Sequence, residues 1–195
     1  MVHAALRESL FNLPNLLTLV RMGSIPLLVG LLYLPGAVWS WLAGGLFLVA
    51  GITDLLDGWL ARRMKKVTVL GQYLDPVADK ILVASMLVML SNLGRLPAWM
   101  TILIICREIA VTGMRALAAT HGLTVPSDRW GKSKTAMQML GVLLLILYYP
   151  MGGFDPAFWG LCSMWLAVAI TAWSGLAYAM GFQRRLGSQR QENQG

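Results

Sequence analysis

Long apolar stretches separated by short polar links run along the whole chain. Six can be distinguished, at about residues 14–34, 39–60, 75–93, 97–119, 134–149 and 156–182. They lack the alternation of polar and apolar positions that marks a membrane β-barrel, and each is near the length that a helix needs to cross a bilayer. A helix also satisfies its own backbone hydrogen bonds in lipid. The pattern therefore predicts an all-α integral membrane protein with six transmembrane helices.

Composition and length support this prediction. Of the 195 residues, 57% are hydrophobic and only 13% are charged, whereas a soluble domain carries about 25% charged residues. The length fits a single domain over residues 1–195. Residues 2–11 are expected to be either an amphipathic helix at the membrane interface or a frayed tail. Cys106 and Cys162 lie in apolar stretches and are interpreted as reduced packing residues.

Lysine and arginine are concentrated in alternate links. Two links and the C-terminal tail contain these basic residues: Arg62, Arg63, Lys65, Lys66, Arg129, Lys132, Lys134, Arg184, Arg185 and Arg190. The other three links are nearly neutral, with Arg95 and Asp155 as their charged residues. Because basic links stay on the cytoplasmic side, both termini are predicted to be cytoplasmic. The net charge of +7 is then assigned to topology and to anionic lipid headgroups, and no nucleic-acid partner is expected.

Four of the nine acidic residues fall within one short segment that spans the basic link. Asp54 and Asp57 are three residues apart, and Asp75 and Asp79 are four apart, so each pair shares one face of a helix. The two helices are joined as an antiparallel pair, which lets the acid pairs face each other near the cytoplasmic surface. Ionisable side chains inside a membrane are costly and indicate function. Four converging carboxylates predict an all-oxygen site for Mg²⁺ or Mn²⁺, with two ions more plausible than one.

Small residues accompany these aspartates. Gly58 and Ala61 remove bulk beside the first pair, and Gly71 lies one turn before the second pair. Such gaps allow a ligand or a neighbouring helix to approach closely, and Arg62 is placed to bind a phosphate through two hydrogen bonds. The alternative is a structural charge cluster in which the aspartates pair with the basic link. That alternative leaves the helical phasing and the small residues unexplained.

The complete motif reads Asp54-x-x-Asp57-Gly58-x-x-Ala61-Arg62 and, after eight residues, Gly71-x-x-x-Asp75-x-x-x-Asp79. It resembles the signature of the CDP-alcohol phosphotransferases at every defining position, and the resemblance extends across the whole chain. It implies an enzyme that transfers a phosphatidyl group from CDP-diacylglycerol to a small alcohol and releases CMP. It also implies a homodimer, located in a bacterial cell membrane.

The resemblance further implies roles for individual residues. Asp54 and Asp75 would bridge two metal ions, and Asp57 and Asp79 would complete the coordination shells. Asp79 would also be the general base for the attacking hydroxyl. The CDP-diacylglycerol site would be formed near these aspartates and at the start of the first helix by Asn15, Thr18, Gly58, Ala61, Arg62, Thr68 and Gly71.

Basic residues in the second half of the chain favour an anionic acceptor. A cluster of unmatched cations is expected from Arg107, Arg115, Lys132 and Lys134. Glu108 and Arg115 share a helix face, so an ion pair between them is the alternative. The segments NLPNLLTLVR, LDPVADK, CREI and GKSKTAMQM together resemble the phosphatidylglycerophosphate synthase branch of the family. This implies sn-glycerol 3-phosphate as the acceptor, with cardiolipin synthase and phosphatidylinositol phosphate synthase as alternatives.

A divalent-cation transporter is the competing interpretation from a different class, since intramembrane aspartates also line permeation paths. A transporter typically places its charges near the midplane on discontinuous helices. Here the acids cluster toward one surface and are accompanied by basic residues of the phosphate-binding type. A purely structural membrane partner would leave the costly acids without a purpose. The pattern therefore favours an enzyme.

Overall fold

The computed structural model describes residues 13–64, 69–120 and 130–192. Within these helices the side chains at positions 13–17, 54–64, 69–76, 118–119, 130–133, 177–179 and 181–192 are outside the description. The predicted N-terminal segment 2–11 and Thr68 also lie outside the described residues.

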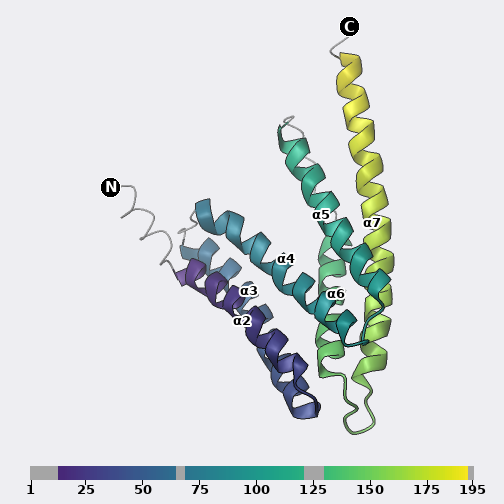
Figure 1. Cartoon of the computed structure of the whole chain (residues 1–195). Coiled ribbons are helices and arrows are strands. Elements are labelled where there is room, and N and C mark those ends of the chain that lie inside the picture. The colour runs from purple at the N-terminus through teal and green to yellow at the C-terminus, as the bar shows by residue number, and fades with distance from the viewer. Residues whose placement is uncertain (1–12, 65–68, 121–129, 193–195) are drawn as a thin grey trace.

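Six helices make up the described part of the chain, which contains no β-strand. In chain order they are α2 (Leu13–Tyr33), α3 (Ala37–Met64), α4 (Val69–Asn92), α5 (Ala98–Thr120), α6 (Trp130–Leu147) and α7 (Pro156–Glu192) (Figure 1). Each corresponds to one predicted apolar stretch, so the all-α prediction is confirmed.

Four helices extend into the basic segments beyond the predicted stretches. α3 continues to Met64, α4 begins at Val69 rather than at residue 75, α6 begins at Trp130 rather than at residue 134, and α7 continues to Glu192. The apolar pattern marks only the part of a helix that faces an apolar environment, whereas Arg, Lys and Gln are good helix formers in water as well. All four aspartates of the motif therefore lie inside helices rather than at their ends.

The helices run alternately up and down. Figure 1 shows the C-terminal ends of α3, α5 and α7 at the end of the molecule where α2, α4 and α6 begin. The links 34–36, 93–97 and 148–155 lie at the opposite end. The axes of α2, α3 and α4 diverge from those of α5 and α7 towards the end where α2 and α4 begin. The helix ends next to the predicted basic segments thus lie at one end of the molecule, while the membrane topology itself stays a prediction.

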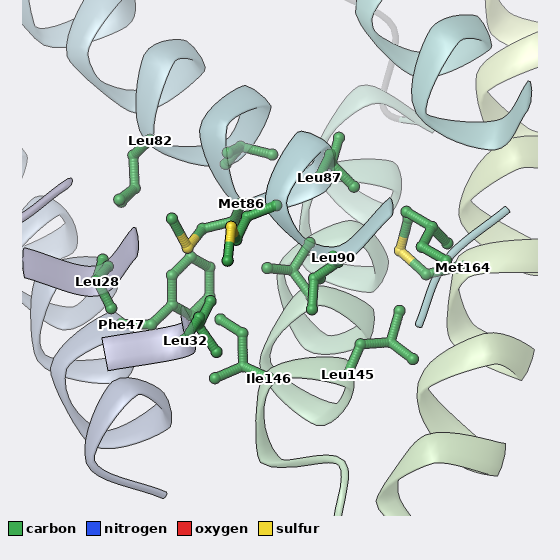
Figure 2. Packing of buried hydrophobic residues seen from close by; sticks show 14 of the residues in the cluster. Leu28, Leu32, Phe47, Leu82, Met86, Leu87, Leu90, Leu145, Ile146 and Met164 are labelled. Atoms are coloured by element: carbon green, nitrogen blue, oxygen red, sulfur yellow. The ribbon is translucent and has the colours of Figure 1, made fainter. Parts of the chain in front are cut away.

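The buried core draws on all six helices (Figure 2). Its largest fully buried side chains are Leu28, Phe47, Leu82, Met86, Leu87, Leu90, Met100, Ile104, Val142, Leu145, Ile146 and Met164. α4 contributes the largest share and lies between the α2–α3 pair and the α5–α7 group, packing against α2, α5 and α6. Its position fixes the relative placement of the two halves, and therefore of the predicted metal site and acceptor site.

α6 and α7 approach each other at two glycines. A Cβ atom at Gly141 would lie 2.7 Å from the Met164 sulfur and 3.3 Å from the Gly160 carbonyl oxygen. A Cβ at Gly160 would lie 2.9 Å from Leu145 Cγ and 3.1 Å from Leu144 Cβ. Only glycine fits at this crossing without displacing a neighbour, which is a common way for membrane helices to pack closely.

Arg95, in the link between α4 and α5, joins three segments at the end opposite the one where α2, α4 and α6 begin. Its guanidinium donates hydrogen bonds to the carbonyl oxygens of Leu145 (3.2 Å) and Ile146 (2.9 Å), and to Ser40 Oγ (3.2 Å). The two carbonyls belong to the last turn of α6, where a helix has no partners of its own and carries partial negative charge. Arg95 therefore caps α6 and ties it to the start of α3.

Two aromatic rings complete this contact. The guanidinium carbon of Arg95 lies 4.4 Å from the ring centre of Tyr148 and 5.8 Å from that of Tyr149, within the range of a cation–π interaction. Burial lowers the pKa of Arg95 from its usual value, while Tyr149 and Tyr148 act in the opposite direction. Since an arginine keeps its proton in proteins, this group remains a cation held inside the fold.

Large apolar side chains face outwards from every helix. They include Leu27, Leu48, Val88, Ile102, Leu140 and, at 69% exposure, Trp173. So many exposed large apolar side chains on every helix are unusual for a water-soluble protein. Among the described residues one helical segment, Pro156–Leu176, is long and apolar enough to cross a membrane. Shorter apolar helical segments are Thr18–Tyr33, Ala37–Thr53 and Lys134–Leu147.

Candidate active site

The helical register places the two acid pairs at matching depths. At about 1.5 Å rise per residue, Asp57 and Asp75 lie about 10 Å from the adjoining ends of α3 and α4, and Asp54 and Asp79 about 15 Å. α3 ends and α4 begins on either side of the short link 65–68, and the two helices run in opposite directions (Figure 1). Asp57 therefore lies at the same depth as Asp75, and Asp54 lies at the same depth as Asp79.

α2 provides the third wall of this region. It packs against both α3 and α4, and its side chains Thr18 and Arg21 are buried. Thr18 is one of the residues predicted for the CDP-diacylglycerol site, and Arg21 lies nearly one turn further along the same helix. A buried hydroxyl and a buried guanidinium beside two acid-bearing helices suit the recognition of a phosphate-containing ligand.

Asp79 is the one member of the acid quartet whose side chain is described, and it is half-buried on α4. Asp54, Asp57 and Asp75 are placed by their helical backbone, while their side chains lie outside the description. Within the described side chains no group of three or more His, Cys, Asp or Glu is assembled. The four-carboxylate centre therefore rests on the register of α3 and α4.

The chemistry of the four carboxylates fits the predicted metal ions, Mg²⁺ or Mn²⁺. Four carboxylates from two helices form an all-oxygen set, the kind that Mg²⁺ and Mn²⁺ select, and no sulfur or imidazole ligand is present in the motif to favour a softer metal. Matched depths on two antiparallel helices are also what two ions shared between the helices require. The residues present are thus suited to a divalent metal pair.

For the other residues predicted for the CDP-diacylglycerol site, Thr68 excepted, the structure describes the backbone but not the side chain. Gly58, Ala61 and Arg62 continue the α3 helix beyond the first acid pair, and Gly71 precedes the second pair on α4. Asn15 lies in the first turn of α2. Their side chains belong to the part outside the description, so the assignment of these residues to the CDP-diacylglycerol site stays a prediction.

Two of the predicted acceptor cations, Arg107 and Lys134, lie together and share one carboxylate, that of Glu108. One oxygen of Glu108 accepts a hydrogen bond from Arg107 (3.0 Å) and another from the Lys134 ammonium. The Lys134 side chain is 4% exposed and that of Glu108 is 29% exposed. Glu108 therefore compensates one of the two positive charges, because a buried ammonium needs a counter-charge when no ligand is bound. The expectation of unmatched cations is met for one charge of this pair and not for the other.

Arg107 reaches α7 as well as Glu108. Its second terminal nitrogen donates to Ser174 Oγ (2.8 Å), and its aliphatic part and Nε lie close to Gly175. The Nε atom is buried and has no hydrogen-bond partner among the described residues. Ser174 was not singled out in the sequence. The sequence feature that could have indicated Ser174 is a pair of polar positions, Thr171 and Ser174, on one face of the apolar segment Pro156–Leu176.

The remaining two predicted acceptor residues stand apart from this group. Arg115 is exposed on α5, two turns beyond Glu108. The ion pairs described for Glu108 are with Arg107 and Lys134, so the alternative pairing with Arg115 is not the one observed. Lys132 lies in the first turn of α6, and its side chain is outside the description.

Lys80 makes a contact that sequence reasoning missed. Its ammonium donates to Thr112 Oγ1 on α5, and the Thr112 hydroxyl donates in turn to the Glu108 carbonyl oxygen (2.7 Å). The signals were present in the chain, since Lys80 follows Asp79 directly and Thr112 lies one turn after Glu108. What the sequence could not supply is the pairing of α4 with α5.

The chain is similar to known proteins over most of its length. The sequence profile of the family described as CDP-alcohol phosphatidyltransferase matches residues 11–173. The chain is 39% identical over 185 residues to the CDP-diacylglycerol–glycerol-3-phosphate 3-phosphatidyltransferase of Bacillus subtilis, covering 87% of this chain and 94% of that protein. The Pseudomonas fluorescens protein of the same name is 42% identical (86% and 88% covered), and that of Rickettsia prowazekii is 36% identical (86% and 93%).

Proposed function

Because the chain belongs to the CDP-alcohol phosphatidyltransferase family, we propose that it transfers the phosphatidyl group of CDP-diacylglycerol to sn-glycerol 3-phosphate. The products are phosphatidylglycerophosphate and CMP. The observation that carries this proposal is the similarity, over more than four-fifths of the chain, to relatives named for this reaction. The cation group of α5 and α6 supports the anionic acceptor, since choline, ethanolamine or serine would gain nothing from it.

The reaction needs one proton transfer and one displacement at phosphorus. An acceptor hydroxyl oxygen forms a bond to the phosphorus of the phosphatidyl group, and the bond from that phosphorus to the bridging diphosphate oxygen breaks. CMP departs with the electron pair. Asp79 accepts the hydroxyl proton, which suits a half-buried carboxylate beside the other acids of α3 and α4.

Asp54, Asp57, Asp75 and Asp79 would hold the divalent ions, Mg²⁺ or Mn²⁺, two in each site. When bound, the ions neutralise the diphosphate and stabilise the charge that develops on the leaving group. The carboxylates themselves keep the site at a fixed depth, because both pairs are anchored in continuous helices. The chain thereby aligns the donor phosphorus with the proton-accepting oxygen of Asp79.

The donor nucleotide would occupy the region that α2, α3 and α4 enclose. Buried Thr18 on α2 supports this placement. The proposed contacts are those of the motif and its surroundings: Asn15, Thr18, Gly58, Ala61, Arg62, Thr68 and Gly71. The glycines and the alanine leave room for the nucleotide, and Arg62 supplies a bidentate contact to a phosphate.

The acceptor phosphate would be bound by Arg107, Arg115, Lys132 and Lys134. Arg107 and Lys134 already converge through Glu108. Each charge-assisted hydrogen bond to a phosphate is worth about 1.5–3 kcal/mol. Arg115→Ala is therefore expected to raise the KM for glycerol 3-phosphate about tenfold or more, with little change in the KM for CDP-diacylglycerol.

We place the chain in a bacterial cell membrane with all six helices crossing it, both termini and the active site on the cytoplasmic side, and two copies forming a homodimer. The outward-facing apolar side chains of every helix support the membrane location. The common end of the helix ends next to the basic segments supports the orientation (Figure 1).

The direct test uses the purified full-length protein with CDP-diacylglycerol and a panel of acceptors. Release of CMP is measured with glycerol 3-phosphate, phosphatidylglycerol, inositol phosphate and inositol, each with Mg²⁺, Mn²⁺ or a chelator. Rapid metal-dependent release with glycerol 3-phosphate is expected. A preference for phosphatidylglycerol or inositol phosphate would replace the acceptor while leaving the family reaction intact.

A further inference from the structure

Lys80 connects the catalytic helix to the acceptor helix. It follows Asp79 on α4, yet its side chain turns towards α5 and donates to Thr112 Oγ1. The Thr112 hydroxyl hydrogen is already given to the Glu108 carbonyl oxygen, so its oxygen is free to accept from Lys80. Lysines near a helix end usually extend to the membrane surface. Lys80 instead reaches sideways from α4 to α5, where it contacts Thr112.

Three cations from three helices meet at this place. Lys134 on α6 lies close enough to Arg107 on α5 and to Lys80 on α4 to be repelled by both positive charges. Glu108 offsets one positive charge through its contacts with Arg107 and Lys134. The printed hydrogen bond of Lys80 goes to a neutral hydroxyl, which supplies no counter-charge. Among the described side chains of Lys80, Arg107, Lys134 and Glu108, three cations thus meet one carboxylate, an excess of two positive charges.

A residual charge of this size suits a phosphate monoester, which carries nearly two negative charges at neutral pH. Like charges held together in a partly buried place are unfavourable unless an anion joins them. A structural link between α4 and α5 would not need a charged partner, because a neutral polar pair forms the same hydrogen bond without the repulsion. The charge balance therefore points to a ligand.

The sequence position of Lys80 gives this charge a catalytic setting. Asp79 is its immediate neighbour, so the proposed base and the third cation lie on adjacent faces of one turn of α4. In glycerol 3-phosphate the attacking hydroxyl and the phosphate are at opposite ends of a three-carbon chain. A molecule of that length can present its hydroxyl to Asp79 while its phosphate meets the cations between α4, α5 and α6.

We propose that Lys80 is an acceptor-binding residue, and that the acceptor phosphate binds among Lys80, Arg107 and Lys134 at the meeting point of α4, α5 and α6. This inference rests on the proposed function and adds to it a cation from the metal-binding helix. Lys80 thereby couples the position of the acceptor phosphate to the position of Asp79.

The test compares Lys80→Met, which removes the charge but keeps the length, with Lys80→Arg, which keeps the charge. Initial rates of CMP release are measured in the purified full-length protein over a range of glycerol 3-phosphate, at saturating CDP-diacylglycerol. Lys80→Met is expected to raise the acceptor KM about tenfold or more, the effect of one lost charge-assisted hydrogen bond. Lys80→Arg is expected to stay close to the parent protein.

Inorganic phosphate gives a second readout, since it carries the charge without the hydroxyl of the acceptor. It is expected to inhibit the parent protein in competition with glycerol 3-phosphate and to inhibit Lys80→Met more weakly. The KM for CDP-diacylglycerol is expected to change little in either variant. An equal rise in both substrates' KM values would contradict an acceptor-specific role.

Thr112→Val is the matched control, because it removes the partner of Lys80 and leaves the charge. A smaller effect than that of Lys80→Met supports the proposal. If Thr112→Val and Lys80→Met change the acceptor KM equally, the lysine acts only as a link between helices and the proposal fails.

Arg115→Ala separates this inference from the proposed function. If Arg115→Ala raises the acceptor KM and Lys80→Met does not, the acceptor site stands and the role of Lys80 is rejected. If the parent protein releases no CMP with glycerol 3-phosphate, the proposed acceptor itself is wrong.

Discussion

Glu108 shows at the scale of single residues how a carboxylate can serve an anion-binding site. It offsets part of the positive charge of Arg107 and Lys134, and it joins α5 to α6. Removing one partner of a buried ion pair leaves the other charge without compensation, which is costlier than removing both. The pair is therefore suited to a test in which each charge is deleted alone and both are deleted together.

Glu108→Gln is expected to lower the melting temperature of the purified protein, because the nearly buried Lys134 ammonium loses its counter-charge. The cost in unfolding free energy is expected to reach at most about 3 kcal/mol, since Glu108 itself is partly exposed. The double variant Glu108→Gln/Lys134→Met should be less destabilised than Glu108→Gln. Thermal unfolding in detergent measures both, and a double variant that loses as much as the two single variants combined would contradict the coupling.

The aspartates of α3 and α4 give the second residue-scale prediction. Asp54→Asn and Asp75→Asn are each expected to reduce CMP release by about a hundredfold or more, because losing a metal ligand removes several kcal/mol of charge stabilisation. The variants should still be recovered in the membrane fraction at normal levels. Near-normal activity in either variant would argue against a metal pair shared by the two helices.

Asp155→Asn is the control for these variants. Asp155 accepts hydrogen bonds from the backbone N–H groups of Ala157 (3.0 Å) and Phe158 (3.3 Å) at the start of α7. Asparagine caps a helix about as well as aspartate. This substitution removes a carboxylate at the opposite end of the molecule, so activity is expected to remain.

At the scale of helices, the apolar pattern predicted every element but not its full length. α3 and α4 extend into the basic link, so that residues 63–64 and 69–70, between Arg62 and Gly71, are helical. The apolar pattern ends where charged residues begin. The helix itself continues, because good helix formers extend its backbone hydrogen bonding into the charged segment. The pairing of helices was not predictable, because six apolar helices offer many packing arrangements with similar buried area.

The crossing of α6 and α7 gives a prediction at this scale. Gly160→Ala places a methyl group within 3.1 Å of Leu144 and Leu145 side-chain atoms, and overpacking of this kind costs about 1–3 kcal/mol. A lower melting temperature is expected. Gly113→Ala on α5 is the matched control, because nothing lies within 4 Å of its added Cβ. Equal melting temperatures for the two variants would show that the close approach is not required.

At the scale of the whole molecule, the proposed orientation in the membrane rests on the common end of the helix ends next to the basic segments. Cysteine replaces Lys65 or Arg184 in a background from which the two exposed cysteines, Cys106 and Cys162, have been removed. A membrane-impermeant thiol reagent is expected to label these positions only after the cells are opened. Met151→Cys, in the link at the other end, should react in intact cells. The reverse pattern would invert the topology.

The helical placement of the four aspartates on α3 and α4 was predictable from sequence, because helical spacing acts within short segments. Their assembly into one site stays a prediction. The acceptor site was only partly predictable. Arg107 and Lys134 were identified by their charge, but Glu108, Ser174 and Lys80 acquire their roles from contacts between helices that are 26 to 67 residues apart in the chain. Local patterns report the chemistry that a segment carries, whereas its partners depend on how the helices pack.

The contact made by Arg95 has a consequence for the order of events during synthesis. The carbonyl groups that it caps belong to Leu145 and Ile146, 50 and 51 residues later in the chain. When the link between α4 and α5 leaves the ribosome, the residues that will receive its charge have not yet been made. In the proposed topology, Arg95 therefore crosses the membrane before α6 is made and stays hydrated on the far side until α6 inserts. When α6 inserts, the carbonyl groups at its C-terminal end bind an arginine that is already in position. The insertion of α6 is therefore the step that completes the packing at this end of the molecule.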